Sequence, residues 1–467
     1  MQLRPYQEKI IDDVRSAFSG GANRVVVYMP TGVGKTVVAS RIINLAIQKG
    51  SCVLFMAHRQ ELVRQASSHV RKYGLPHGTI MAGCPEDRSK KLQIASIGTL
   101  ARREFPDSDL SFFDEVHHCV SRQWRDLAEK SRKVIGLTAT PRRLDGRGLG
   151  DIFCTMVKSP SIAWFVQKGY LVKPRIFAPF VPDFSKFQLQ GGDFSRSQTS
   201  SQMSEPDIVG DVVKQWLKTA NGLQTICFAC NIDHSKKICE AFRAQGVSAE
   251  HVDGNTPKDE RDKITGRFAC KLFQILCNVE VFTEGFDCPE VGCIIMARPT
   301  ASEALYLQMA GRALRKADGK NECIIMDHAG NAVNHGHILE DRKWELDKTP
   351  PKKKELGETF PIKICPQCWA VYRPHVMVCS QCGHDFEAKQ REIIASQEEL
   401  HELTLEKAGQ IKREENRLYA CFHIQKKDGK KRDAYKTLLL IQKLRGHKGK
   451  WADCRFFATF NHCPPRR

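Results

Sequence analysis

The sequence predicts an α/β protein with two tandem parallel-sheet domains, followed by a small cysteine-rich module and a basic α+β tail. Apolar strand-like runs alternate with helical patterns twice, over residues 1–172 and 207–340, as in parallel sheets covered by helices. Two C-x-x-C pairs follow residue 360, and the end of the chain is strongly basic. A chain of 467 residues is too long for one hydrophobic core, which also favours several domains.

The composition is that of a globular protein with a polyanionic partner. Hydrophobic residues make up 41% of the chain and charged residues 27%, which is ordinary, but the formal net charge of +19 is not. This charge favours nucleic acid, although a membrane surface or simple solubility would also permit it. No apolar run is long enough to span a bilayer, so no membrane partner is expected. The nineteen cysteines are mostly scattered singly, which indicates reduced thiols in a cytosolic protein.

A glycine-rich loop in the first domain predicts a phosphate-binding site. A β-branched strand pattern precedes residues 29–36, which have the sequence Met-Pro-Thr-Gly-Val-Gly-Lys-Thr, and a helical pattern follows them. Lys35 would supply a point charge to the β- and γ-phosphates, and the Thr36 hydroxyl would hold Mg²⁺. Met29 stands where the strict pattern has glycine, so Gly32 is expected to give the turn its freedom. The loop residues expected at the nucleotide are Thr31, Gly32, Gly34, Lys35 and Thr36.

An acidic pair follows the fourth of five strands expected in this domain. These strands are expected at 24–29, 52–57, 92–96, 110–114 and 133–138. Asp114 and Glu115 stand at the carboxyl end of the fourth strand, where parallel sheets bind ligands. Asp114 is expected to join the Mg²⁺ shell, and Glu115 to orient or deprotonate an attacking water. An isolated Asp-Glu pair is usually a solvated turn, but several βα units after a phosphate loop it is a strong signal.

Motifs in a fixed order resemble those of the superfamily 2 helicases and translocases of the DEAD/DEAH-type group. Besides the glycine loop they are Leu3-Arg4-Pro5-Tyr6-Gln7, Ala57-His58-Arg59-Gln60-Glu61-Leu62, Ser96-Ile97-Gly98-Thr99-Leu100, Asp114-Glu115-Val116-His117 and Leu137-Thr138-Ala139-Thr140-Pro141. The resemblance implies two RecA-like domains that bind ATP and Mg²⁺. The roles it implies are adenine contact for Gln7, nucleic-acid contact for Arg59 and Thr99, a link to the second domain for His117, and coupling of hydrolysis to domain movement for Thr138 and Thr140.

The architecture is expected to repeat after a connecting segment at 173–206, which is rich in Ser, Gln and Gly. Residues 224–229 predict the first strand of the second domain, and residues 235–245 predict the helix that follows. Cys227 and Cys230 form a C-x-x-C. Their odd spacing on a strand sends the thiols to opposite faces, so core positions are expected rather than metal ligands.

Two further stretches, 282–289 and 308–315, match the fifth and sixth motifs of the same family. Arg312 and Arg315 are three apart on an expected helix, so both guanidinium groups can reach one phosphate and stabilise its developing charge. The alternative is a solvated basic helix without a binding role, which is common for isolated arginine pairs. The other site residues implied by the resemblance are Gln308 at the water, Gly285 and Asp287 at the nucleotide, and Thr283 at the nucleic acid.

Paired cysteines after a Pro/Lys-rich linker at 341–360 predict a zinc ribbon at 361–387. Four thiolates leave no open coordination position, so the zinc would be structural and the module would depend on it for folding. His384 lies beyond the complete ligand set. The ribbon would read DNA, dock a replication or repair protein, or brace the motor, and the sequence leaves these open. The expected zinc ligands are Cys365, Cys368, Cys379 and Cys382.

A helical spacer at 388–416 and a basic tail at 417–467 are expected to complete the chain. The tail holds fourteen Lys and Arg against three Asp and Glu. Asp428-Gly429 predicts the turn of a β-hairpin. Basic residues interleaved with aromatics suit phosphate contact with base stacking, and a small aromatic core under a basic surface is an equally good interpretation. The tail residues expected to contact nucleic acid are Lys430, Lys431 and Arg432.

These observations predict an ATP-dependent helicase or translocase that acts on DNA in replication, repair or recombination. ATP would close the cleft between the two domains, and hydrolysis would reopen it. The alternatives are an ATP-gated nucleic-acid scaffold that does not unwind, an RNA helicase, and the motor of a restriction-type nuclease, for which no appended carboxylate-lysine motif is evident. The expected compartment is the cytoplasm of a bacterial or phage-infected cell, with a nucleus as the alternative because of the lysine run at 352–354.

Overall fold

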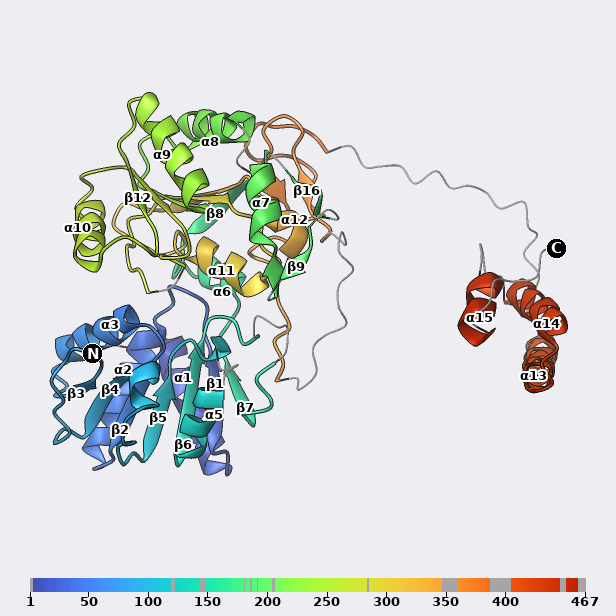
Figure 1. Cartoon of the computed structure of the whole chain (residues 1–467), viewed down its shortest axis with the longest axis horizontal. Helices are drawn as coiled ribbons and strands as arrows, with labels where there is room; N and C mark the ends of the chain where they lie inside the picture. The colour runs from blue at the N-terminus through green and yellow to red at the C-terminus, as the bar shows by residue number, and fades with distance from the viewer. Residues whose placement is uncertain are drawn as a thin grey trace. The chain divides into compact units, whose positions relative to one another are not determined.

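Two parallel sheets organise the larger of the two units into which the chain divides, Met1–Ala388 and Lys389–Arg467 (Figure 1). All strand pairs in these two sheets are parallel, and helices lie against them, as the sequence predicts. None of the helices in the described part of the chain is both long and apolar enough to cross a bilayer. The computed structural model describes residues 3–118, 122–142, 148–179, 181–184, 187–190, 192–203, 206–283, 285–346, 360–386, 405–445 and 451–460.

The first domain contains a seven-stranded sheet in the order β3-β4-β2-β5-β6-β1-β7. Its strands are near-continuous apolar runs because both faces are covered: Val26 of β1 enters one core cluster, and Val25 and Val27 enter another. All five expected strands are present, with β3 and β7 in addition. The elements are α1 (Pro5–Ser19), β1 (Arg24–Tyr28), α2 (Lys35–Gln48), β2 (Val53–Ala57), α3 (Gln60–Lys72), β3 (Gly78–Ile80), β4 (Leu92–Ser96), α4 (Ile97–Leu100), β5 (Leu110–Phe113), the 3-10 turn η1 (Val116–His118), α5 (Arg122–Glu129), β6 (Lys133–Thr138), β7 (Thr155–Lys158) and α6 (Ile162–Gln167).

The second domain contains a six-stranded sheet in the order β12-β13-β11-β14-β15-β8. Its edge strand β8 lies inside the expected connecting segment 173–206, so that expectation is wrong for these residues. β8 pairs in parallel with β15, but its own sequence, Lys-Pro-Arg-Ile-Phe, carries Pro174 and two cations, a pattern confined to sheet edges. The elements are β8 (Lys173–Phe177), β9 (Leu189–Gln190), β10 (Asp193–Phe194), α7 (Arg196–Met203), α8 (Pro206–Thr219), β11 (Thr225–Ala229), α9 (Ile232–Ala244), β12 (Ala249–Val252), α10 (Lys258–Ala269), β13 (Ile275–Asn278), β14 (Cys293–Ala297), α11 (Glu303–Gly311), β15 (Glu322–Asp327) and α12 (Asn331–His335).

The cysteine-rich module continues from the edge of the second sheet. Its two short strands, β16 (Lys363–Ile364) and β17 (Val371–Tyr372), are antiparallel. Phe177 of β8 forms an antiparallel bridge with Ala370, and the N–H of Ala178 donates to the carbonyl of Trp369 over 3.0 Å. Cys365 and other residues of the module belong to the same hydrophobic cluster as Phe177. The module is therefore part of the second domain's core.

Unit 2 is helical in its described residues, which corrects the expected α+β tail. It consists of α13 (Leu405–Lys427), α14 (Lys431–Leu444) and α15 (Trp451–Phe460). The predicted turn at Asp428-Gly429 is present, with φ of +70° at Gly429, but it joins two helices rather than two strands. The hairpin prediction is therefore wrong. The reason is that a turn signal does not specify whether strands or helices flank the turn. The expected spacer, 388–416, and linker, 341–360, fall largely on residues 387–404 and 347–359, outside the described residues.

The helices of unit 2 enclose a small aromatic core. Phe422, Tyr435 and Phe456 are buried together with aliphatic residues from all three helices. Among the side chains that the structure describes in the tail, the aromatic ones are therefore mostly used for packing, although Phe457 is half exposed. This supports the interpretation of an aromatic core beneath a basic surface.

Gly136 in β6 provides a test of the packing of the first domain. A β-carbon at this position would lie 2.8 Å from Cζ of Phe153 and 3.0 Å from Cγ1 of Val116. We expect Gly136→Ala to lower the free energy of unfolding by about 1–3 kcal/mol, because overpacking forces side chains from their rotamers. Chemical denaturation measures this change. Gly210→Ala is the control: nothing lies within 4 Å of its added carbon, and in the interior of α8 it should gain about 0.5–1 kcal/mol. An unchanged midpoint for Gly136→Ala would contradict the packing.

Candidate active site

The glycine loop joins β1 to α2 and ends at Gly34, the residue that precedes the first turn of the helix. Gly32 and Gly34 have φ of +88° and +91°, a left-handed conformation that strains residues with a β-carbon. A β-carbon at Gly34 would also lie 2.6 Å from Nε2 of Gln7. Met29 is buried at the end of β1, where its N–H donates to the carbonyl of Thr138. The departure at Met29 therefore leaves the turn intact.

Helix α1 packs over the same loop. The Tyr6 hydroxyl donates to the carbonyl of Val33 over 2.8 Å, and burial, the largest influence, raises the pKa of this phenol so that it stays a donor. The Gln7 side chain is buried. Its Oε1 accepts from the N–H of Arg4 over 3.0 Å, and its Nε2 donates to the carbonyl of Val33 over 3.4 Å. The amide expected at the adenine thus lies beside the phosphate loop.

A buried ion pair joins the loop to the acidic motif. Nζ of Lys35 lies 2.7 Å from Oε1 of Glu115, and the two side chains are only 14% and 13% exposed. Glu115 has φ of +48°, a strained conformation for a residue with a β-carbon, and such strain concentrates at functional sites. Oδ1 of Asp114 accepts from the N–H of Glu115 over 3.1 Å. The structure therefore brings together the lysine and both carboxylates that the sequence singled out.

His117 connects this ion pair to the second domain. Its Nδ1 lies 3.1 Å from Oγ1 of Thr138 and 3.4 Å from Oε2 of Glu115. The Thr138 hydroxyl donates its own proton to the carbonyl of Thr140, and a carboxylate accepts only, so Nδ1 of His117 carries the proton. Nε2 is then the acceptor for the side-chain amide of Gln308, 3.3 Å away on α11. The expected link from His117 to the second domain is thus a buried hydrogen bond.

The C-terminal end of α11 lies directly against the phosphate loop. A β-carbon at Gly311 would lie 2.7 Å from Cβ of Thr31, and one at Gly32 would lie 3.0 Å from Cγ of Arg315. Glycine on each side allows this close approach. The sixth motif of the second domain therefore reaches the first domain's phosphate loop.

The fifth motif holds both arginines of this segment. Arg312 donates to the carbonyls of Phe286 over 2.7 Å and Thr283 over 2.6 Å. Arg315 donates to the carbonyl of Phe286 over 3.0 Å and pairs with Asp287 over 2.5 Å. Burial lowers the pKa of Arg315, and the charge of Asp287 partly offsets this effect. The two guanidinium groups converge on one carbonyl oxygen, but not from the face of a helix as expected, because α11 ends at Gly311 and Arg315 forms an isolated bridge with Leu171.

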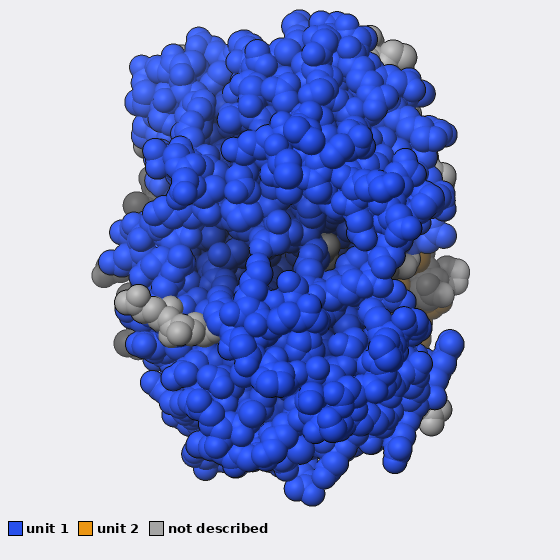
Figure 2. Space-filling model, turned by 90° about the vertical axis from the view of Figure 1, so that its left-hand side faces the viewer, with its two compact units in different colours: residues 1–388 blue, residues 389–467 orange. Residues whose placement is uncertain are grey.

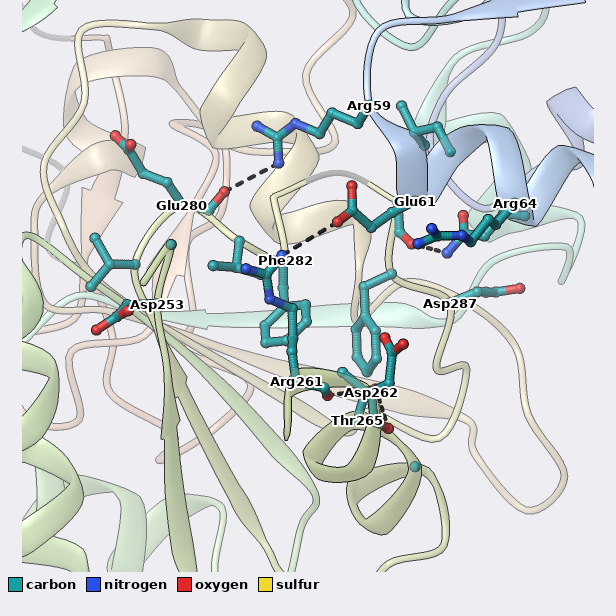
Figure 3. Close-up of a pocket in the computed structure, with 18 of the residues that line it drawn as sticks. Arg59, Glu61, Arg64, Asp253, Arg261, Asp262, Thr265, Glu280, Phe282 and Asp287 are labelled. Atoms are coloured by element: carbon teal, nitrogen blue, oxygen red, sulfur yellow. Dashed lines mark hydrogen bonds and ion pairs between the residues drawn. The ribbon is translucent and has the colours of Figure 1, made fainter. Parts of the chain in front are cut away.

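A cleft of about 1410 Å³ lies between the two domains and is lined by both (Figure 2). Thr36 and Asp114 line it from the first domain, and Gly285 and Asp287 line it from the second. Figure 3 shows contacts across it, among them the ion pair of Glu61 with Arg261 over 3.4 Å. Four of the residues expected at the nucleotide therefore share one cavity, whose lining does not include Gln7, Thr31, Gly32, Gly34 or Lys35.

The residues expected at nucleic acid are distributed over three places. Arg59 donates across the cleft to the carbonyl of Glu280 over 3.5 Å, and the Thr283 hydroxyl donates to the same carbonyl over 3.3 Å. Thr99 lies on α4, where its hydroxyl accepts from the N–H of Ala82. The structure thus brings Arg59 and Thr283 together. The exposed cations at the start of α14 belong to unit 2: Lys430, Lys431 and Arg432.

Sequence reasoning missed a further group of contacts between the two domains. Glu303, the first residue of α11, pairs with Arg142 of the first domain over 3.4 Å and with Arg342 over 2.7 Å. The buried Trp344 packs against Tyr28 of β1, with ring centroids 5.9 Å apart, and lies under the Arg142 guanidinium. The chain therefore returns to the first domain after the second. An isolated tryptophan in a charged stretch was the one signal in the sequence.

The four expected cysteine ligands form one cluster. Their Sγ atoms all lie within 4.8 Å of one another, with Cys365 to Cys382 at 3.6 Å and Cys368 to Cys379 at 3.5 Å. Sulfurs placed tetrahedrally at about 2.3 Å from zinc would be about 3.8 Å apart, so the cluster fits a structural zinc site. The Tyr372 hydroxyl lies 3.3 Å from the sulfur of Cys379, a contact that supports a thiolate.

The other cysteine pair behaves as expected for core residues. Cys227 and Cys230 lie in different hydrophobic clusters, and Cys230 donates to the carbonyl of Ala297 over 3.3 Å. Burial raises the pKa of Cys230 to about 12, which disfavours a metal-binding thiolate. Both thiols therefore occupy buried core positions, and the absence of a metal at this pair stays a prediction. His384 is likewise no member of the ribbon's four-cysteine cluster within the described residues.

Family comparisons match both sheet domains. The family described as "Type III restriction enzyme, res subunit" matches residues 1–143, and "Helicase conserved C-terminal domain" matches residues 208–317. A "51.5 kDa protein" of a Lactococcus phage (isolate 7-9) is 31% identical over 369 residues, which is 78% of this chain and 79% of the phage protein. The "Putative mitochondrial ATP-dependent helicase irc3" of Schizosaccharomyces pombe is 33% identical over 353 residues. That match covers 70% of this chain but only 57% of the yeast protein.

A solved structure shares the fold. The fragment of a putative HsdR subunit of a type I restriction enzyme from Vibrio vulnificus YJ016 superimposes with a TM-score of 0.59 at 22% identity, over 74% of this chain and 67% of that one. The two parallel-sheet domains are RecA-like, as expected from the sequence. Family matches on both domains, the extended similarity to the phage protein and the contacts that join the motifs of the two domains lead to one conclusion: the chain belongs to the superfamily 2 helicases.

Proposed function

We propose that the protein is an ATP-dependent helicase or translocase that acts on DNA. The observation that carries the proposal is the unbroken series of contacts from Lys35 through Glu115 and His117 to Gln308. These contacts join the phosphate loop of the first domain to the sixth motif of the second. A nucleotide phosphate that binds Lys35 would displace the Glu115 carboxylate. Because His117 contacts that carboxylate, the displacement would also change the contact of His117 with Gln308.

The nucleotide would lie between the phosphate loop and α11. Lys35 would bind the β- and γ-phosphates, with the backbone from Thr31 to Gly34 around them and Gln7 at the adenine. Thr36 and Asp114 would hold Mg²⁺, which neutralises phosphate charge when bound. Their placement on one cleft supports this assignment.

Hydrolysis would use groups from both domains. Glu115 would accept a proton from the attacking water once Lys35 is occupied by phosphate, and Gln308 would orient that water. Arg312 and Arg315 would stabilise charge on the transferred phosphoryl group, after leaving the carbonyl of Phe286. Gly285 and Asp287 would contact the nucleotide and relay its state.

DNA is the proposed track. The net charge of +19 favours a polyanion, and the family model that matches residues 1–143 is described as a subunit of a restriction enzyme. Arg59, Thr99 and Thr283 would contact the backbone. Unit 2 would add phosphate contacts through Lys430, Lys431 and Arg432. The proposed role is in replication or repair, and the phage source of one relative supports the cytoplasm of an infected bacterial cell as the compartment.

Zinc is proposed as the resident metal of the cysteine cluster, held by Cys365, Cys368, Cys379 and Cys382. Because Cys365 and Cys379 belong to the hydrophobic cluster that contains Phe177 of β8, the ribbon would brace the second domain. Met377 and Val378 on the ribbon are half exposed and would be available to a replication or repair protein.

Substitution of the ion pair tests the catalytic assignment. We expect Lys35→Ala and Glu115→Gln to lower the turnover of ATP about a hundredfold or more. The first variant removes the positive charge that would bind the phosphates, and the second removes the general base. Steady-state ATPase assays measure this, with circular dichroism to confirm folding. Lys9→Ala, which removes an exposed lysine of α1, is the control and should retain full activity. Wild-type turnover in either active-site variant would overturn the assignment.

Nucleic-acid stimulation tests the substrate. If DNA is the track, single-stranded or forked DNA should raise the ATPase rate more than RNA of the same length. The salt concentration is held fixed, because phosphate contacts make affinity strongly salt-dependent. Glu115→Gln serves as the blank. Equal or stronger stimulation by RNA would replace DNA by RNA as the track. Stimulation without strand displacement on forked DNA would favour translocation or an ATP-gated scaffold over unwinding.

Removal of the metal tests the role of the ribbon. We expect about one zinc per chain by elemental analysis, and loss of that zinc in Cys365→Ser. Thermal unfolding should then begin at a lower temperature, because the ribbon shares the core of the second domain. Cys421→Ser, at an exposed cysteine of unit 2, is the matched control and should keep both zinc and stability. Zinc loss with no change in unfolding would exclude the bracing role.

A further inference from the structure

A series of charges leads from the small hairpin β9–β10 into the second domain. Oδ1 of Asp193 accepts from the Thr300 hydroxyl over 2.9 Å and from the N–H of Ala301 over 2.7 Å. Its Oδ2 lies 2.9 Å from Arg298, whose other terminal nitrogen lies 2.7 Å from Oε1 of Glu280. The hairpin is thereby fixed to the end of β14 and to the segment before the fifth motif.

Arg298 is the centre of this series. Its side chain is 13% exposed, and it binds one carboxylate on each side. Burial acts to lower the pKa of Arg298, but the charges of Asp193 and Glu280 outweigh it and raise that pKa. The guanidinium geometry can hold two carboxylates at once with defined directions, which a lysine cannot do.

The backbone of Glu280 faces the cleft while its carboxylate faces Arg298. Glu280 has φ of +59°, a conformation that costs free energy in a residue with a β-carbon and that surrounding contacts must hold. Its carbonyl accepts from Arg59 of the first domain and from the Thr283 hydroxyl. Figure 3 shows Arg59 reaching this carbonyl while the Glu280 carboxylate points the other way.

The segment from Glu280 to Thr283 also contacts the sixth motif. The Thr283 hydroxyl binds the carbonyl of Glu280, and the Thr283 carbonyl accepts from Arg312 over 2.6 Å. A displacement of Glu280 would therefore move a contact of Arg59 and a contact of Arg312 together. The first lies on the proposed nucleic-acid side, and the second on the proposed nucleotide side.

We propose that Arg298, held by Asp193, is a positioning residue that fixes Glu280 and so couples nucleic-acid binding to the arginines of the ATPase site. This inference rests on the proposed function. A buried ion pair can also be purely structural, and such a pair would affect stability without affecting coupling. The two roles differ in which kinetic parameter they change.

The test is an ATPase titration with single-stranded DNA on the full-length protein. The variants are Glu280→Ala, which removes a side chain that is 37% exposed and should be tolerated by the fold, and Asp193→Asn. For both we expect the DNA-stimulated rate to fall roughly threefold to thirtyfold, while the rate without DNA and the KM for ATP stay the same. The double variant should be no worse than the more severe single variant, since both act through Arg298.

Arg267→Gln is the matched control, since Arg267 forms a more exposed ion pair with Glu250 in the same domain and should leave stimulation unchanged. Arg298→Lys, which keeps the charge but binds less precisely, should retain part of the stimulation. Equal losses with and without DNA, an unchanged stimulated rate, or additive losses in the double variant would overturn the positioning role. A wild-type ATPase indifferent to nucleic acid would instead overturn the proposed function.

Discussion

The buried ion pair of Lys35 and Glu115 is the interaction on which the site depends. An ammonium and a carboxylate removed from water are costly unless they meet, so the ends of β1 and β5 must be placed to let them do so. β6 lies between these two strands, and its last residue, Thr138, supplies the next hydrogen bond through His117. One pair thus fixes three neighbouring strand ends. It also defines the effect of an anionic ligand, which would compete with Glu115 for Lys35.

The domain interface is built from glycines and arginines for opposite reasons. Gly311 and Gly32 leave room for the side chains of Thr31 and Arg315 from the opposite domain, which an added β-carbon would crowd. Arg312 and Arg315 can reach beyond that contact, and both bind the carbonyl of Phe286. These hydrogen bonds give both buried guanidinium groups a backbone partner, so neither depends on a carboxylate alone. Such groups can exchange a backbone oxygen for a phosphate oxygen at moderate cost.

The additions after the second domain differ in how they are held. The cysteine module shares a core with β8, because Phe177 contacts Ala370 and both belong to one hydrophobic cluster. Unit 2 has a core of its own around Phe422 and Phe456. Trp344 has a third role, since it returns the chain to β1 of the first domain. The segment that follows the second domain therefore also contacts the first domain and helps to join the two.

Local patterns of the sequence determined the elements and the chemistry of the site. The strand, glycine loop and helix around Lys35, the acidic pair after β5 and the spacing of the four cysteines each depend on residues close in the chain, so periodicity and spacing reveal them. Tertiary contacts decided the rest. β8 became a strand by pairing with β15 far along the chain, and Asp428-Gly429 came to join helices because the flanking residues pack a helical core. The links of Asp193 to Arg298 and of Trp344 to Tyr28 join residues with no shared local pattern. The physical reason is that each of these contacts gains its free energy from a partner distant in sequence, which no local propensity encodes.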